Sequence, residues 1–105
     1  KEQATRFDVN VVPINKSPRD VELKFSEPVY ISIDLDGLDP AYAPGVSHPE
    51  PGGLSTRDII NFISNIEGEI IGADIVEYNP YKDINEITAI TAAKLLKELM
   101  GKILE

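Results

Sequence analysis

The sequence contains no cysteine and no tryptophan, and its only histidine is His48. Without cysteine the chain forms no disulfide, thiolate metal site or cysteine nucleophile. The absence of cysteine suits a reducing cytoplasm, where we expect the protein to reside. Arginine is also scarce, with three residues among 105, and no basic cluster occurs. Together with a net charge of −8, this scarcity argues against a nucleic-acid or anionic-membrane surface.

Long hydrophobic runs are missing as well, because no apolar stretch approaches the roughly 20 residues that span a bilayer. The N-terminus shows no signal-peptide pattern. The hydrophobic content of 42% is nevertheless that of a globular protein. A length of 105 residues suits one domain or a piece of a larger one. Small molecules and cations are therefore the expected partners.

Hydrophobic periodicity predicts alternating strands and helices. Strands are expected at residues 7–14, 29–34 and 70–76, and helices at 55–68 and 84–104. Continuous apolar strands separated by helices favour an α/β fold with a parallel sheet covered on both faces. Three strands and two helices are too few to cover such a sheet, so this chain is expected to be part of a larger domain or to need partner subunits.

Sequence signals mark the ends of both predicted helices. Ser55 and Asp58 form the hydroxyl-x-x-acid pattern of a helix start, and Gly68 is typical of a helix end. In the last helix six apolar residues recur at helical spacing, and we expect them to face the core, with a subunit interface as an additional role. They are Ile84, Ile87, Ile90, Leu95, Leu99 and Ile103.

Acidic side chains gather where the predicted strands end. Asp34 and Asp36 close one strand, and Glu77 follows the next. Because side chains alternate along a strand, Asp34 and Asp36 are expected to point the same way. Two adjacent carboxylates repel each other unless a cation lies between them, and their oxygens suit Mg²⁺ or Mn²⁺. Ligands of parallel sheets bind beyond these strand ends, so the sequence predicts a metal site there.

Simpler interpretations stay open for the same residues. Asp34 and Asp36 could form only a solvated strand end, and Glu77 could cap a neighbouring helix. His48 lies in a loop rich in proline and glycine, residues 37–53. It could be a metal ligand, a proton shuttle or a substrate contact, or only a loop residue near a pocket mouth. An unrelated metal-dependent enzyme, such as a phosphohydrolase, could also use an Asp-x-Asp pair at a strand tip.

Three motifs, in this order, resemble the ureohydrolases, the arginase and agmatinase family of binuclear manganese enzymes. They are SIDLDGLDP at 32–40, PEPGGL at 49–54 and ADIVEYNP at 73–80. The resemblance implies a three-layer α/β/α fold with a mainly parallel sheet. Residues 1–105 would form only the C-terminal part of that single domain.

The resemblance also implies roles for individual residues. Asp34 and Asp36 match metal ligands of two Mn²⁺ ions, one of the carboxylates bridging both, so Asp36 counts as catalytic as well. Glu77 matches the acid that contacts the guanidinium of the substrate and is expected to be catalytic too, and Gly53 matches the loop beside it. His48 stands where the family commonly carries threonine, which makes it a candidate substrate contact.

The implied reaction is hydrolysis of a guanidinium compound to an amine and urea. The PEPGG stretch resembles agmatinases more than arginases, so agmatine, giving putrescine and urea in polyamine synthesis, is the expected substrate. Arginine, guanidinobutyrate and formiminoglutamate are the alternatives. The family commonly forms trimers or hexamers, so a homo-oligomer is expected.

The family's other metal ligands lie on two histidine-bearing segments, of Gly-Gly-Asp-His and Asp-Ala-His-x-Asp type, and neither occurs here. The chain therefore carries at best two metal ligands and one substrate residue. Alone it is expected to bind Mn²⁺ weakly and to release no urea. The alternative is a non-catalytic remnant or assembly module of the same fold.

Overall fold

The computed structural model describes residues 10–105, apart from the side chain of Arg19. Its regular elements are two strands, two α-helices and three short 3-10 helices. In chain order they are η1 (Pro18–Asp20), β1 (Val29–Asp34), η2 (Leu35–Gly37), α2 (Thr56–Asn65), β2 (Ile70–Val76), η3 (Pro80–Lys82) and α3 (Ile87–Ile103). The predicted strands at 29–34 and 70–76 are confirmed. The predicted strand at 7–14 is wrong for residues 10–14, which form no strand, and its first residues lie outside the described range.

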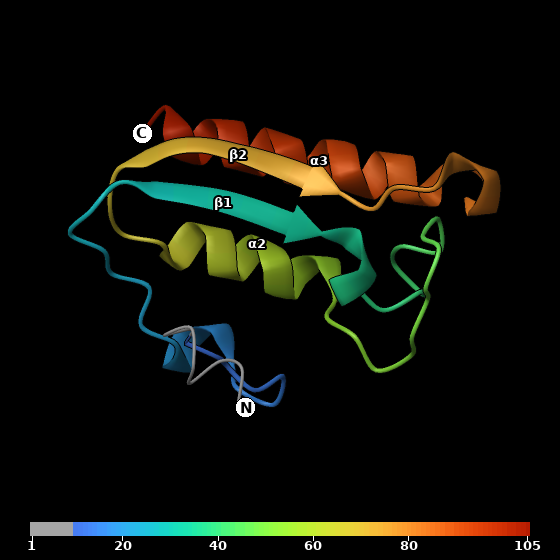
Figure 1. Cartoon of the computed structure of the whole chain (residues 1–105), viewed down its shortest axis with the longest axis horizontal. Helices are drawn as coiled ribbons and strands as arrows, with labels where there is room; N and C mark the ends of the chain where they lie inside the picture. Colours follow the sequence, from blue (N-terminus) through green and yellow to red (C-terminus); the bar gives the residue numbers. More distant parts are fainter. Residues whose placement is uncertain (1–9) are drawn as a thin grey trace.

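β1 and β2 pair in parallel, so their C-terminal ends meet at one end of the molecule (Figure 1). Asp34, the last residue of β1, lies opposite Val76, the last residue of β2. This pairing places the segments that follow the two strands side by side. The parallel arrangement confirms the predicted α/β class.

Both helices pack on the same face of the sheet, because one buried cluster contains residues of β1, α2 and α3, and the two helices contact each other. The core members are Ile33, Leu35, Leu38, Ala43, Val46, Ile60, Ile63, Leu95 and Leu99. Tyr30 and Ser32 project from the other face and are exposed, and both donate hydrogen bonds to Asp74. Helices on both faces were predicted. Residues 10–105 supply the sheet and one helical layer of that arrangement.

α2 begins where the sequence predicts and ends earlier. The Ser55 hydroxyl accepts the backbone N–H of Asp58, and the Asp58 carboxylate accepts the backbone N–H of Ser55. This reciprocal pair satisfies amides that the first helical turn leaves without partners. The helix ends at Asn65 because Ile66 is already extended. Gly68, with φ of +143°, instead serves the turn into β2, where a side chain would meet the carbonyl oxygen of Phe25 at 2.9 Å.

The buried face of α3 differs from the predicted one. Of the six apolar residues expected in the core, only Leu95 and Leu99 are buried. The other four are 39–64% exposed: Ile84, Ile87, Ile90 and Ile103. Thr88 is fully buried, and Ala92 packs against the core. Residues 88, 92, 95 and 99 form a continuous helical stripe, and it is this stripe that faces β2 and α2. None of the helices within residues 10–105 has the length and apolar character needed to cross a membrane.

Replacing Gly101 by alanine is expected to stabilise the protein. Gly101 is exposed in the last turns of α3, and no atom lies within 4 Å of the position its Cβ would take. Alanine in a helix is favoured over glycine by about 0.5–1 kcal/mol, so chemical denaturation should show a gain of that size. Gly52→Ala is the matched control, since its Cβ also meets open space but its φ is +93°. It should lose stability. A loss for Gly101→Ala would mean that another part of the protein packs there.

Candidate metal and substrate site

Asp34 and Asp36 are brought together by a tight turn at the end of β1. The strand ends at Asp34, and Leu35 already begins η2. The backbone N–H of Asp36 donates to Oδ1 of Asp34 over 2.9 Å. The prediction that strand alternation aligns the two side chains is therefore wrong, because Asp36 lies in η2 and not in the strand. The hydrogen bond nevertheless holds the two residues next to each other at the sheet edge.

One oxygen of Asp36 is buried without a partner. Its Oδ1 accepts no hydrogen bond from any residue in the described range, whereas Asp34 is exposed to solvent. An unpaired buried acceptor costs about 1–3 kcal/mol, and more when it is charged. A cation bound to this oxygen would remove that cost, and a pair of carboxylates is the hard donor set that Mn²⁺ accepts. Within residues 10–105, however, no group of three or more His, Cys, Asp or Glu side chains is placed to hold a metal ion. These residues fit part of a site.

Glu77 lies at the same end of the sheet. It follows β2 directly, one residue beyond the pair of Asp34 and Val76, and it is exposed. Its φ of 71° lies in the left-handed region, which non-glycine residues rarely adopt. Such a backbone costs about 1–3 kcal/mol, so the contacts around it must hold this turn in place.

The loop that carries Gly53 and His48 is fastened to the end of β1. The N–H of Asp39 donates to the carbonyl of Leu54 over 2.8 Å, and the N–H of Leu54 donates to the carbonyl of Gly37 over 3.0 Å. Gly53 lies inside this junction. A Cβ on Gly53 would come within 2.7 Å of backbone atoms of Leu38 and Asp39, so only glycine fits this close approach. The predicted substrate loop thus begins and ends at the Asp34–Asp36 turn.

The Asp39 carboxylate ties the far part of the same loop. It accepts the backbone N–H groups of Ala41 and Gly52, each over 2.9 Å. These two hydrogen bonds hold the pKa of Asp39 below its usual value, because they stabilise the ionised form. The Asp39 carboxylate therefore fixes the shape of the segment that contains Gly53.

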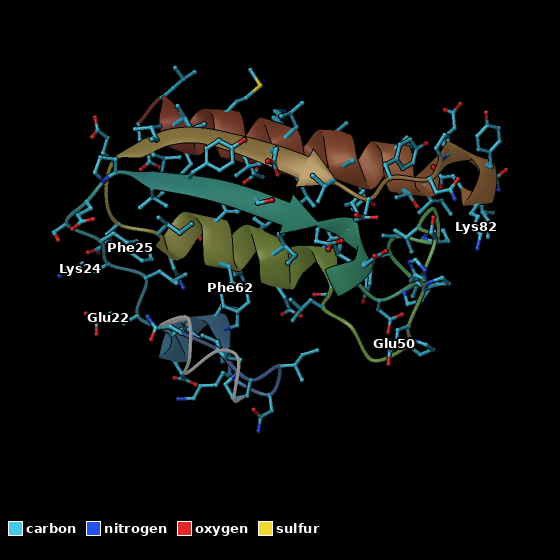
Figure 2. All side chains as sticks on the ribbon, in the orientation of Figure 1. Glu22, Lys24, Phe25, Glu50, Phe62 and Lys82 are labelled. Atoms are coloured by element: carbon cyan, nitrogen blue, oxygen red, sulfur yellow. The ribbon has the colours of Figure 1, made fainter. Side chains whose placement is uncertain are left out.

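His48 is exposed on this loop, next to a contact with the turn that follows Glu77. The side-chain amide of Asn79 donates to the hydroxyl of Ser47 over 3.0 Å, and Nζ of Lys82 donates to the Ser47 carbonyl over 3.3 Å. Figure 2 shows Glu50 and Lys82 at the same end of the molecule, on the segments that follow β1 and β2. The structure therefore brings the His48 segment and the Glu77 turn together.

Sequence reasoning missed Asp83, whose carboxylate is the most heavily hydrogen-bonded in this region. It accepts the backbone N–H groups of Thr88 and Ala89 and the hydroxyl of Tyr78. Desolvation opposes its ionisation, but the hydrogen bonds from Thr88, Ala89 and Ile84 prevail and lower the pKa of Asp83 to about 2. A usable signal was present, because Asp83 directly precedes the predicted helix start at Ile84, a position where aspartate caps helices.

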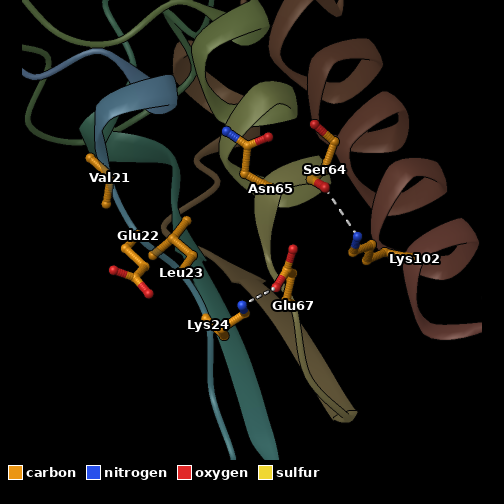
Figure 3. Close-up of a pocket in the computed structure, with 8 residues that line it drawn as sticks. All are labelled: Val21, Glu22, Leu23, Lys24, Ser64, Asn65, Glu67 and Lys102. Carbon is orange, nitrogen blue, oxygen red and sulfur yellow. Dashed lines mark hydrogen bonds and ion pairs between the residues drawn. The ribbon is translucent and has the colours of Figure 1, made fainter.

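A cavity of about 560 Å³ lies at the opposite end of the strands (Figure 3). Lys102 donates there to the carbonyl of Ser64, and Lys24 pairs with Glu67. The other lining residues are Val21, Glu22, Leu23 and Asn65. None of the predicted site residues lines this cavity, so it is separate from the candidate site.

Comparison with known proteins identifies relatives along nearly the whole chain. The family model described as "Arginase family" matches residues 5–101. The mitochondrial arginase 1 of Arabidopsis thaliana is 49% identical over 98% of this chain and 32% of its own length. The mitochondrial agmatinase of Gallus gallus is 47% identical over 70% of this chain and 22% of its own length. The solved arginase from Medicago truncatula superposes with a TM-score of 0.87 at 48% identity, covering 97% of this chain and 35% of that one.

Two consequences follow from these relatives. The chain spans about a third of the length of the arginases it matches, in agreement with the single helical layer on its sheet. The expectation of a cytoplasmic location is wrong, because similar arginases are named mitochondrial in Arabidopsis and Medicago, and chloroplastic/mitochondrial in a second Arabidopsis protein. Absence of cysteine is a weak indicator here, since it is compatible with many compartments.

Proposed function

This chain belongs to the arginase family, and we propose that the protein containing it hydrolyses a guanidinium group to an amine and urea. The observation that supports this most is the placement of three carboxylates at one sheet end. Asp34 and Asp36 close β1, Glu77 follows β2, and one Asp36 oxygen is buried without a partner. Three carboxylates concentrate negative charge at this end of the sheet. Metal ions and a guanidinium cation would both be attracted to that charge, whereas a neutral ligand would not require it.

We propose that Asp34 and Asp36 hold part of a binuclear manganese site. The ions supply the Lewis acidity that activates water for attack on a resonance-stabilised carbon. Asp36 offers its buried, unpaired oxygen as a ligand. Asp34 would supply its own carboxylate as a second ligand, and the hydrogen bond from the N–H of Asp36 to Oδ1 of Asp34 keeps the two residues next to each other. Residues 10–105 hold no complete set of metal ligands, so the remaining ligands would come from other parts of the protein.

Glu77 is proposed to bind the substrate. A carboxylate and a guanidinium form paired charge-assisted hydrogen bonds in one plane, which fixes the direction in which the central carbon faces. Holding that carbon close to the activated water lowers the entropic part of the barrier. The backbone around Gly53 and the side chain of His48 would border the same substrate group, because their loop is fastened to the end of β1 and to the turn after Glu77.

We propose arginine as the substrate and agmatine as the second candidate. Plant arginases match 98% of the chain at 45–49% identity. The agmatinases of chicken and fission yeast match 69–70% of it at 46–47% identity. The longer match supports arginine, whereas the PEPGG stretch supports agmatine. We also keep a homotrimer or homohexamer as the proposed assembly, with the exposed apolar residues of α3 as one surface for contacts.

The test is urea release by the full-length, manganese-loaded protein. L-arginine is expected to exceed agmatine in kcat/KM by roughly 100-fold or more, since a site built to bind the α-carboxylate penalises a substrate that lacks it. A preference for agmatine would make the enzyme an agmatinase. A phosphate ester serves as the control substrate, and hydrolysis of that ester without any urea release would refute the proposed function.

A further inference from the structure

Asp83 lies at the centre of a hydrogen-bond network that joins the two segments proposed to contact substrate. One segment is the loop with Gly53 and His48, and the other is the turn with Glu77. Neither segment is held by β-sheet pairing at this point, because β2 ends at Val76. Hydrogen bonds outside the sheet must therefore fix their relative position, and they involve both backbone and side-chain groups.

Asp83 first anchors the start of α3. Its Oδ1 accepts the N–H of Thr88 over 2.9 Å, and its Oδ2 accepts the N–H of Ala89 over 3.1 Å. The residue that precedes the helix, Glu86, makes no capping hydrogen bond of its own and has a φ of 61°. Asp83 therefore supplies the cap from three residues upstream, and its negative charge is favourable at this positive end of the helix.

The same carboxylate also holds the residue next to Glu77. The hydroxyl of Tyr78 donates to Oδ2 of Asp83 over 3.1 Å. Glu77 itself has the strained φ of 71°, so its side-chain direction depends on what restrains its neighbours. Through Tyr78 the Glu77 turn is tied to the rigid start of α3.

The loop with His48 also contacts Asp83 and its partner Thr88, through Gly45. The N–H of Gly45 donates over 2.7 Å to the hydroxyl of Thr88, which is buried, and the Gly45 carbonyl accepts the N–H of Asn79 over 2.7 Å. A Cβ on Gly45 would lie 3.0 Å from side-chain atoms of both Asp83 and Thr88. The loop thus packs directly on the capped helix start.

We infer that Asp83 is a positioning residue, which sets the Glu77 carboxylate relative to the His48 loop through Tyr78 and Thr88. Asp83 does not contact the substrate. The inference rests on the proposed function, because it assumes that Glu77 binds the guanidinium. It assigns to Asp83 a role in substrate affinity beyond its role as a helix cap.

Tyr78→Phe separates the two roles, because it removes the hydroxyl that reaches Asp83 and leaves the cap of α3 intact. In the full-length, manganese-loaded protein it is expected to raise KM about 10-fold, because a shift of about 1 Å in a binding group can cost up to 100-fold. Manganese content should stay unchanged, and Tm should fall only slightly, since Tyr78 is 41% exposed. Asp83→Asn should raise KM at least as much and lower Tm further, because it also weakens the cap of α3. Glu86→Gln is the matched control, since it removes a carboxylate from the same segment without breaking a hydrogen bond, and it should change none of these quantities.

The outcomes distinguish this inference from the proposed function. If the wild-type protein releases urea and Tyr78→Phe leaves KM unchanged, Asp83 is only a helix cap and the inference is overturned, while the proposed function stands. If the wild-type protein releases no urea from any guanidino compound, both are refuted. Should Asp83→Asn fail to fold, the KM of Tyr78→Phe still decides.

Discussion

Asp36→Ala is expected to weaken Mn²⁺ binding of the full-length protein by more than about 100-fold and to abolish urea release. Loss of a residue that only supports a metal ligand typically costs 10–100-fold, so loss of a ligand should exceed that range. Asp36 carries the one buried side-chain oxygen in residues 10–105 that has no hydrogen-bond partner, which is the state expected of a ligand oxygen. Titration calorimetry with Mn²⁺ and a urea assay measure the two effects.

The same substitution is expected to change the thermal stability in opposite directions with and without metal. Without Mn²⁺ the unpaired Asp36 oxygen is a cost, so alanine should leave Tm unchanged or raise it. With Mn²⁺ at 100 times its Kd, the wild-type protein gains about 2.7 kcal/mol, and the variant loses this gain. Glu69→Ala removes an exposed carboxylate at the other end of β2 and is the control. It should change neither the Tm without Mn²⁺ nor the stabilisation by Mn²⁺. Equal Mn²⁺ stabilisation of Asp36→Ala and wild type would show that Asp36 is not a ligand.

Elements with strong local signals could be predicted closely from the sequence. β1 and β2 are mainly apolar segments, interrupted only by Ser32 and Asp74 before their last residues, and their limits agree with the prediction at 29–34 and 70–76. The start of α2 is fixed by two side chains within one turn, Ser55 and Asp58, so no distant part of the chain is needed. Of the site residues, Asp34 ends β1 and Glu77 directly follows β2, and the parallel pairing of these strands was predicted. Their shared end of the sheet follows from that pairing.

Features that depend on distant contacts could not be predicted. The choice of buried face on α3 depends on where β2 and α2 lie. The helix carries more apolar residues than its buried face contains, so the apolar pattern alone does not identify that face. The hydrogen bond between Gly45 and Thr88 joins residues 43 positions apart, and no local pattern announces it. The wrong prediction for Asp36 has a local cause instead. It extended the side-chain alternation of β1 to Asp36, although the chain already turns at Leu35.

Gly53→Ala is expected to cause the largest loss of stability among the glycine substitutions considered. The added Cβ would lie 2.7 Å from the carbonyl carbon of Leu38 and from the backbone N of Asp39, and 2.9 Å from the carbonyl oxygen of Gly37. Backbone atoms cannot move aside as a flexible side chain can, so the loop must separate from the end of β1. Overpacking of this kind typically costs about 1–3 kcal/mol, and more where backbone must shift. Chemical denaturation measures the loss.

Gly37→Ala is the matched control for this substitution, since Gly37 lies at the same junction and nothing lies within 4 Å of its Cβ position. The control should retain stability, KM and Mn²⁺ affinity. Gly53→Ala should raise KM more than about 10-fold, because a shift of about 1 Å at a binding site can cost up to 100-fold. Mn²⁺ affinity then separates two explanations. If Gly53 only borders the substrate, Mn²⁺ affinity stays unchanged. If the clash displaces Leu38 and Asp39, the displacement reaches the preceding turn with Asp36, and Mn²⁺ affinity falls together with substrate affinity. The direct backbone contact favours the second outcome, in which the glycine of the substrate loop also preserves the geometry of the metal ligands.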